Sequence, residues 1–297
     1  MKTKRIIAAV CALLLMLTAV GCGKSANSAD TEAVMAALDK FSACKSFTIV
    51  QVTECRETIT IDKQAQVYDS RNELLLSLQT EPELQIMRST TVSAESEGDL
   101  FEKSSISYII PENGGYSEYI FDGYEWLKIS AEDGSDLEGI NAASITATFF
   151  ADQLSYYKAG EEQLDGGMAA RDNGTLDGDA LINMLGGFGY LNSVASMSEN
   201  QQAKVMENLL KDLKGVTVSV WVDKATGYPV RFETDMGDVL KDIEKSISKS
   251  LGNKSMNSQY TISGCTISMA AKDFDAVGEI VLPADAASAK PYDYEIS

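Results

Sequence analysis

A two-residue alternation of apolar and polar side chains runs through much of this chain, and it restricts the fold more than any other feature. The alternation is clearest from 216 to 222, where every second residue is valine. A turn that ends at Gly227 follows, and the alternation resumes from 230 to 236. Because successive side chains of a strand point to opposite faces of its sheet, this pattern predicts antiparallel strands with one apolar and one polar face.

Other segments with the same period predict a long antiparallel meander. They lie near 46–67, 84–92, 106–110, 116–129, 168–176 and 260–269. Asp122 and Gly123 form a hairpin turn within this meander, because glycine accepts the positive φ that tight turns need. In the last segment Ile262 and Cys265 differ in parity, and we expect a bulge at Gly264 to return both to one face.

Apolar residues that recur every three or four positions predict helices between the strands. The expected helices cover 30–41, 141–157, 180–194, 201–213 and 239–251. Helices inserted into a meander need a sheet face to cover, so the chain is predicted to be α+β. No internal repeat or long linker divides it, and 30–297 is therefore expected to form a single domain.

The N-terminal segment has the three parts of a secretory signal. Three basic residues among the first five precede an apolar run from 6 to 17, and small residues lead up to Cys22. The run is too short to span a hydrocarbon core of roughly 30 Å as a permanent helix. Residues 1–21 are therefore expected to be a signal peptide that is removed.

The sequence from Leu17 to Cys22 resembles the lipobox of bacterial lipoproteins. The resemblance implies cleavage before Cys22, a diacylglyceryl thioether on its sulfur, and a mature protein held on the extracytoplasmic face of the cell membrane. Ala19 departs from the pattern, which more often has leucine there. Two acyl chains anchor a protein stably where one binds reversibly, and the small polar residues of 22–29 are expected to form a tether.

The composition excludes several classes of function. The 297 residues include no His, so the chain cannot form a Ser-His or Cys-His nucleophile pair or a His-ligated metal site. The formal net charge is -19, which opposes binding to nucleic acid or to an anionic membrane surface. The lipid at Cys22, rather than surface charge, is therefore expected to hold the chain at the membrane.

The acidic clusters do not match a metal-binding or catalytic pattern. Residues 132–138 and 172–179 have the composition of calcium loops, but leucine stands where an EF-hand has an oxygen ligand at the fifth position. Asp273 and Asp275 form a carboxylate pair with no nucleophile beside them. No glycine-rich phosphate loop follows a strand. We expect no metal, no cofactor and no enzymatic activity.

Three cysteines accompany the lipidated one in the mature chain. Cys44, Cys55 and Cys265 allow one disulfide with one free thiol, or three reduced thiols that pack as small buried hydrophobes. The spacing does not choose between these alternatives, and the second is favoured.

Three segments resemble the LolA-like and LppX-like superfamily of bacterial lipoproteins, in particular a Gram-positive branch. They are 119–128 with its Asp-Gly turn, 220–236 with its Trp-Val-Asp strand, and 273–283. The resemblance implies a strongly curved, incomplete antiparallel barrel whose concave face is covered by helices around an apolar cavity. Relatives carry the acyl chains of lipoproteins or of envelope lipids, so the resemblance implies a lipid, such as an acyl chain, or another hydrophobic ligand, without carrying over its identity.

Alternating residues of the C-terminal strands and aromatic residues of the expected helix at 141–157 are predicted to line that cavity. They are Val218, Val220, Val222, Val230, Phe232, Ile262, Ile267, Met269, Phe149, Phe150, Tyr156 and Tyr157. Such a lining binds acyl chains by burying area, at about 25 cal/mol per Å². The same residues would equally pack a closed core, in which case a surface scaffold or sensor that binds a protein or wall polymer is the alternative function.

Replacing Cys22 with Ser should abolish metabolic labelling of the chain with palmitate, because serine has no thiol to form the thioether. The measurement is the label recovered on the immunoprecipitated full-length chain from bacterial cells, with Cys44→Ser as the control that keeps the label. Label that persists in the Cys22→Ser chain would contradict the lipobox interpretation.

Overall fold

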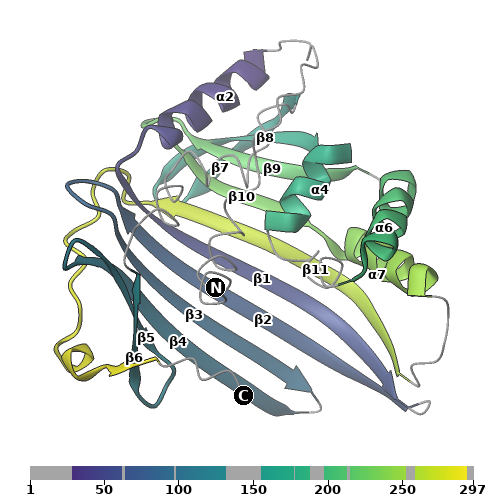
Figure 1. Cartoon of the computed structure of the whole chain (residues 1–297). Coiled ribbons are helices and arrows are strands. Elements are labelled where there is room, and N and C mark those ends of the chain that lie inside the picture. The colour runs from purple at the N-terminus through teal and green to yellow at the C-terminus, as the bar shows by residue number, and fades with distance from the viewer. Residues whose placement is uncertain are drawn as a thin grey trace.

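The described residues form one open, twelve-stranded sheet that curls strongly on itself (Figure 1). The structure is a computed structural model that describes residues 29–61, 64–96, 98–131, 155–176, 178–187, 197–212, 215–251 and 258–292. The strand order is β12-β6-β5-β4-β3-β2-β1-β11-β10-β9-β8-β7. Every neighbouring pair is antiparallel except β12 with β6, so the predicted meander is confirmed.

The elements have the following bounds. The strands are β1 (Ser46–Ile61), β2 (Gln64–Gln79), β3 (Gln85–Ser96), β4 (Asp99–Glu112), β5 (Gly115–Phe121), β6 (Trp126–Ala131), β7 (Tyr156–Leu164), β8 (Gly167–Leu176), β9 (Val216–Asp223), β10 (Pro229–Asp235), β11 (Ser258–Lys272) and β12 (Lys290–Pro291). The helices are α2 (Ala29–Ser42), α4 (Gly178–Gly187), α6 (Glu199–Asp212), α7 (Gly237–Leu251) and the short 3-10 helix η1 (Ala284–Ser288).

The register of the sheet gathers apolar side chains on one face. Phe47 of β1 lies opposite Leu78 of β2, Leu78 lies opposite Ile86 of β3, and Ile86 lies opposite Ile109 of β4. All four are buried in one core together with residues of α2, α4, α6 and α7, such as Phe41. The helices therefore cover the inner, concave face, which confirms the α+β fold of a curved antiparallel sheet (Figure 1).

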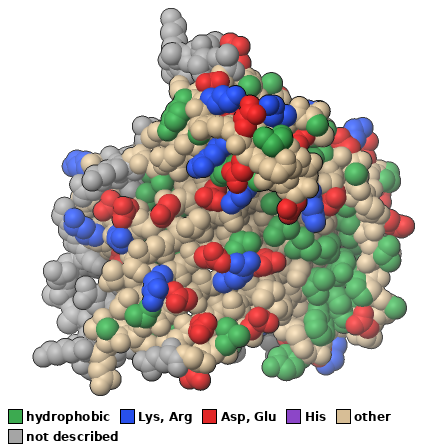
Figure 2. Space-filling view, turned by 180° about the vertical axis from the view of Figure 1, so that it is seen from behind, with side chains coloured by type: hydrophobic (Ala, Val, Ile, Leu, Met, Phe, Trp, Pro, Cys, Tyr) green, Lys and Arg blue, Asp and Glu red, His purple; other side chains and the backbone are tan. Residues whose placement is uncertain are grey.

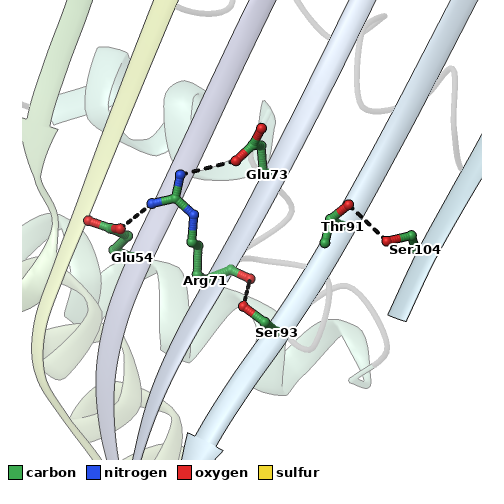
Figure 3. Close-up of polar contacts among 6 residues, drawn as sticks. All are labelled: Glu54, Arg71, Glu73, Thr91, Ser93 and Ser104. Atoms are coloured by element: carbon green, nitrogen blue, oxygen red, sulfur yellow. Dashed lines mark hydrogen bonds and ion pairs between the residues drawn. The ribbon is translucent and has the colours of Figure 1, made fainter. Parts of the chain in front are cut away.

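The outer, convex face of β1 to β3 is polar. Arg71 of β2 pairs with Glu54 of β1 and, at 3.0 Å, with Glu73 (Figure 3). Thr91 of β3 and Ser104 of β4 share a hydrogen bond of 2.9 Å. Figure 2 shows charged side chains of both signs spread over this face. Exposed ion pairs typically contribute less than about 1 kcal/mol each to the stability of the fold. Their main effect here is to favour hydration of the convex face, so that the apolar face packs against the helices.

Strands β1 and β11 join the two halves of the sheet. β1 pairs with β2 on one side and with β11 on the other along almost its full length. The register shifts between Arg56 and Glu57, where Ser263 is the extra residue in β11. This bulge, predicted next to it at Gly264, turns Ile262 and Cys265 to the same face, and both are buried.

A disulfide crosses this central pair of strands. Cys55 and Cys265 lie directly opposite each other and are bonded, and they stand 210 residues apart in the sequence. Cys44, just after α2, is a free buried thiol. The three cysteines of the described residues therefore form one disulfide and leave one free thiol, and the favoured expectation of three reduced thiols is wrong. Spacing did not show this, because the pairing follows from strand register.

The predicted helices at 30–41, 180–194, 201–213 and 239–251 are confirmed within the described residues, as α2, α4, α6 and α7. The prediction of a helix that reaches 157 is wrong, because Tyr156 and Tyr157 begin β7. Thr31 of α2 donates to the Tyr156 carbonyl at 3.2 Å and accepts from the Tyr156 N–H at 2.9 Å. These bonds and the pairing with β8 hold the segment extended despite its helical periodicity.

The C-terminal segment runs back across the convex face of β4, β5 and β6. Ala286 of η1 is buried there with Tyr119 and Trp126, and Leu282 and Ala289 pack beside them. The hydrophobic area at the right of Figure 2 lies over these strands and this segment. A second, smaller core therefore forms outside the barrel, and β12 covers part of the β6 edge.

The predicted signal peptide and nearly all of the tether, with Cys22, lie outside the described residues. Within the described part of the chain, no helix has both the length and the apolar character needed to cross a bilayer. The lipid anchor stays a prediction.

Removing the disulfide should destabilise the fold strongly, because the crosslink removes the entropy of a very long loop from the unfolded chain. The Cys55→Ala/Cys265→Ala chain should lose up to roughly 5 kcal/mol in its free energy of unfolding, measured by urea denaturation. Cys44→Ala is the control: it should keep the crosslink and hence its sensitivity to a reducing agent. Equal stability of the double variant and the oxidised wild-type chain would contradict the assignment.

Candidate functional site

The concave face is where most of the predicted lining residues meet. Val218, Val220, Phe232, Ile262, Ile267, Met269 and Tyr156 are buried in the core there, and Val222 packs against them partly buried. Val230 is partly buried and Tyr157 is 55% exposed. Tyr157 follows the inward-facing Tyr156 in a strand and so faces the other side. Phe149 and Phe150 lie outside the described residues. The buried ones form a layer of the core beneath the helices, and their role in lining a ligand cavity stays a prediction.

Past this core, the concave face carries apolar side chains on β2 and again on β5 and β6, and the polar residues Arg88, Thr90, Ser105 and Ser107 of β3 and β4 lie between them. By register Leu74 and Leu76 of β2, Ile120 of β5, and Leu127 and Ile129 of β6 share the concave face, and each is partly exposed. We call these five residues the open strip. A sheet face that stays partly in contact with water is normally polar, as the convex face of β1 to β3 is here. An apolar surface left partly open is typical of a binding surface.

One ion pair lies on the concave face among these apolar residues. Arg88 of β3 and Glu118 of β5 are joined at 3.2 Å across β4, with 33% and 13% of their side chains exposed. Arg88 lies opposite Ser107, and Glu118 lies opposite the buried Ile109. Among the ion pairs of the described residues, this one has the least exposed carboxylate. This ion pair was not predicted from the sequence, although Arg88 lies two residues after Ile86 and therefore on the same face of β3.

A second charged group on the concave face is Asp172 of β8. It is 5% exposed and lies opposite Val220. Its carboxylate has no hydrogen-bond or ion-pair partner among the described residues. Burial raises the pKa of Asp172, the nearby Asp30 raises it further, and Lys158 opposes the rise. An acid kept in such a position costs stability, which makes it a candidate polar contact for a ligand.

The acidic clusters in the sequence have structural roles in the described residues. The Asp275 carboxylate accepts the backbone N–H of Lys45 at 2.7 Å, in the turn that follows β11. The segment from 172 to 176 belongs to β8 and is therefore not a loop, and 132–138 lies outside the described residues. Over the part of the chain that the structure describes, no three His, Cys, Asp or Glu side chains are placed to hold a metal ion.

The hairpin that contains Trp221 and Asp223 also stabilises the fold. The Asp223 carboxylate accepts the hydroxyl of Thr226 at 2.6 Å and its N–H at 2.7 Å, and the hydroxyl lowers the pKa of Asp223 most. The turn fixed in this way places Tyr228 on Phe274, with ring centroids 4.2 Å apart. Trp221 points to the convex side, where two arginines lie over its ring at 5.0 and 4.8 Å.

A shallow groove of about 470 Å³ is the second candidate site, on the convex face. Most of its lining residues are charged or carry a hydroxyl: the lining is Glu54, Cys55, Arg56, Asp69, Ser70, Arg71, Ser93, Glu95, Leu100, Asp235, Gly264, Cys265 and Thr266. Both arginines are engaged in ion pairs. Arg71 pairs with Glu54 and Glu73 (Figure 3), and Arg56 pairs with Asp69 at 3.7 Å. The groove therefore suits a polar partner rather than an acyl chain.

Comparisons with known proteins give low-scoring likenesses in structure and none in sequence. No family model and no curated protein matches this chain. Among solved structures, it is similar to the lipoprotein LprF from Mycobacterium bovis, with 11% identity and a TM-score of 0.42 over 86% of this chain and 97% of that one. It is also similar to the lipoprotein LppX from Mycobacterium tuberculosis, with 10% identity and a TM-score of 0.37 over 85% of this chain and 98% of that one.

A further similar structure is a putative outer membrane lipoprotein-sorting protein domain from Vibrio parahaemolyticus. It shares 8% identity, with a TM-score of 0.19 over 82% of this chain and 90% of that domain. These neighbours are of the kind that the sequence resemblance named. Their TM-scores are too low to support an inference about ligands, so the site has to be interpreted from the residues of this chain.

Replacing Asp172 with Asn should stabilise the fold at neutral pH, by about 1 kcal/mol, because it removes a charge from a buried position without a partner. The folded-state pKa lies above the ordinary 3.8. The unfolded chain therefore ionises first, and the cost to the wild type grows as pH rises from about 4 to its folded pKa. Urea denaturation at pH 7 and pH 4 should show the gain disappear at the lower pH. Asp223→Asn, with a lowered pKa, should instead destabilise at neutral pH, and the same sign for both variants would contradict this account.

Proposed function

We propose that this chain is a lipid-anchored, extracytoplasmic protein that binds the acyl part of a lipid or another hydrophobic ligand on its concave face. The single observation that carries the proposal is the open strip. Its five apolar side chains lie on the concave face of β2, β5 and β6 and stay partly exposed to water. Covering them with an acyl chain gains roughly 25 cal/mol for each Å² of apolar surface buried.

The chemistry of the rest of the chain is consistent with binding rather than catalysis. The sequence contains no His, and the carboxylates of Asp223 and Asp275 are engaged in turns. A non-enzymatic role is accordingly part of the proposal. The anchor is argued from the lipobox resemblance at Cys22, which would keep the binding face close to a membrane from which a ligand can enter.

Analysis of co-purified lipid tests the proposal. The full-length chain is purified in mild detergent from bacterial membranes, and the lipids extracted from it are quantified by mass spectrometry. Leu74→Asn should lower the bound lipid about tenfold, because an amide replaces apolar contact area on the concave face. Its matched control is Leu75→Asn, the next residue of β2, which faces the convex side opposite Val50 and should keep the lipid.

Two results would contradict the proposed function. The first is a wild-type chain that carries no lipid above the level found on an unrelated lipoprotein purified in the same way. The second is an equal loss of lipid in the Leu74→Asn and Leu75→Asn chains, since that would follow from damage to the sheet and not from loss of a contact.

The convex groove favours one other function, that of a surface scaffold or sensor. Its charged and hydroxyl lining would recognise a protein or a wall polymer without any small ligand. A stoichiometric partner recovered from cells with the full-length chain, absent when Ser93→Trp fills the groove, would favour this function, provided that the wild-type chain carries no lipid.

A further inference from the structure

The Arg88–Glu118 pair lies beside the open strip, in the position that the polar headgroup of a bound lipid would occupy. By register it stands on the same face as the open strip: Arg88 lies opposite Leu76, and Glu118 lies opposite Ile129. The apolar residues therefore flank the pair on both sides along the sheet. A ligand whose acyl chain covers the open strip brings its polar end within reach of this pair.

The guanidinium of Arg88 retains unused hydrogen-bonding capacity. Glu118 is its only hydrogen-bond or ion-pair partner among the described residues, through one nitrogen at 3.2 Å. A guanidinium has five N–H donors in a planar fork, so most of its donors depend on solvent at the exposed third of the side chain. An acyl chain that covered this surface would remove that water and leave the donors without acceptors. An unsatisfied buried donor costs more free energy than a typical hydrogen bond contributes.

Once the water is removed, an anionic group is the best acceptor for the N–H donors of Arg88. Carboxylates and phosphates accept two parallel N–H bonds from one guanidinium, and such charge-assisted bonds are stronger than bonds to a neutral hydroxyl. Glu118 is 13% exposed and holds the guanidinium from the side of β5, so its role is to position Arg88 and not to contact the ligand. We propose, on the basis of the proposed function, that the ligand is an anionic lipid whose carboxylate or phosphate binds Arg88 while its chain lies on the open strip.

Photo-crosslinking with two probes that differ only in the headgroup tests this proposal. Membranes that contain the full-length chain are labelled with a diazirine-bearing fatty acid or with the fatty alcohol of the same chain length. The wild-type chain should half-saturate at an acid concentration about 10- to 100-fold below that of the alcohol. Arg88→Gln should remove most of this preference by weakening labelling with the acid far more than labelling with the alcohol, and the alcohol labelling that remains shows that the variant is folded.

Three further variants separate the role of Arg88 from a general effect of charge. Arg71→Gln is the matched control, because Arg71 is paired with two carboxylates on the convex face and should keep the preference for the acid. Arg88→Lys should keep part of the preference, since it retains the charge without the fork. Glu118→Gln should keep the preference for the acid as well, because the amide oxygen still accepts from Arg88.

The failures of the two proposals give different results. If neither probe labels the wild-type chain, the proposed function fails and the headgroup site with it. If both probes label it with equal affinity, or if Arg88→Gln leaves the preference intact, hydrophobic binding stands and the headgroup site is overturned. Competition with oleate and with 1-oleoyl lysophosphatidate then assigns a carboxylate or a phosphate by the stronger competitor, whereas equally strong competition by oleyl alcohol would overturn the site.

Discussion

The pairing of β1 with β11 is the contact on which the rest of the structure depends. It joins an N-terminal set of strands, β1 to β6, to a C-terminal set, β7 to β10, and it does so between residues that are 197 to 224 positions apart. Such a contact closes a long loop and is entropically costly to form. The chain stabilises it with a disulfide at Cys55 and Cys265 and with a bulge that keeps both parts of β11 on one face. Without this pair of strands there would be two small sheets and no common concave face.

The concave face carries the function proposed here because it combines two properties that are usually separate. At one end it is a closed core in which Phe47, Leu78 and Phe232 are fully buried against the helices. Towards β5 and β6 the same face carries apolar side chains that are partly exposed, and it holds the Arg88–Glu118 pair. A core alone would explain the first region. The second has the composition of an amphiphile site, with apolar area beside a charged group that is incompletely hydrogen-bonded.

The convex face shows how the rest of the charge is used. Its ion pairs, such as Arg71 with Glu54 and Glu73, are well exposed and contribute little to stability. They keep the convex face of β1 to β3 hydrated, whereas the buried apolar residues of these strands face the concave side. The acid excess of the sequence is consistent with this division, because a strongly negative exterior is repelled by anionic headgroups, so that attachment to a membrane would depend on the proposed lipid anchor.

The local patterns of the sequence determined the elements, and the tertiary structure determined what faces what. Period-two alternation was enough to predict the β9–β10 hairpin and the bulge near Gly264, because parity and turn glycine act over a few residues. The same reasoning misassigned Tyr156 and Tyr157, since their extended form comes from Thr31 and from β8, which are distant in the chain. The disulfide, the open strip and the Arg88–Glu118 pair were invisible for a similar reason. Each depends on which residues the register of neighbouring strands sets side by side, and register is fixed by packing across the whole sheet.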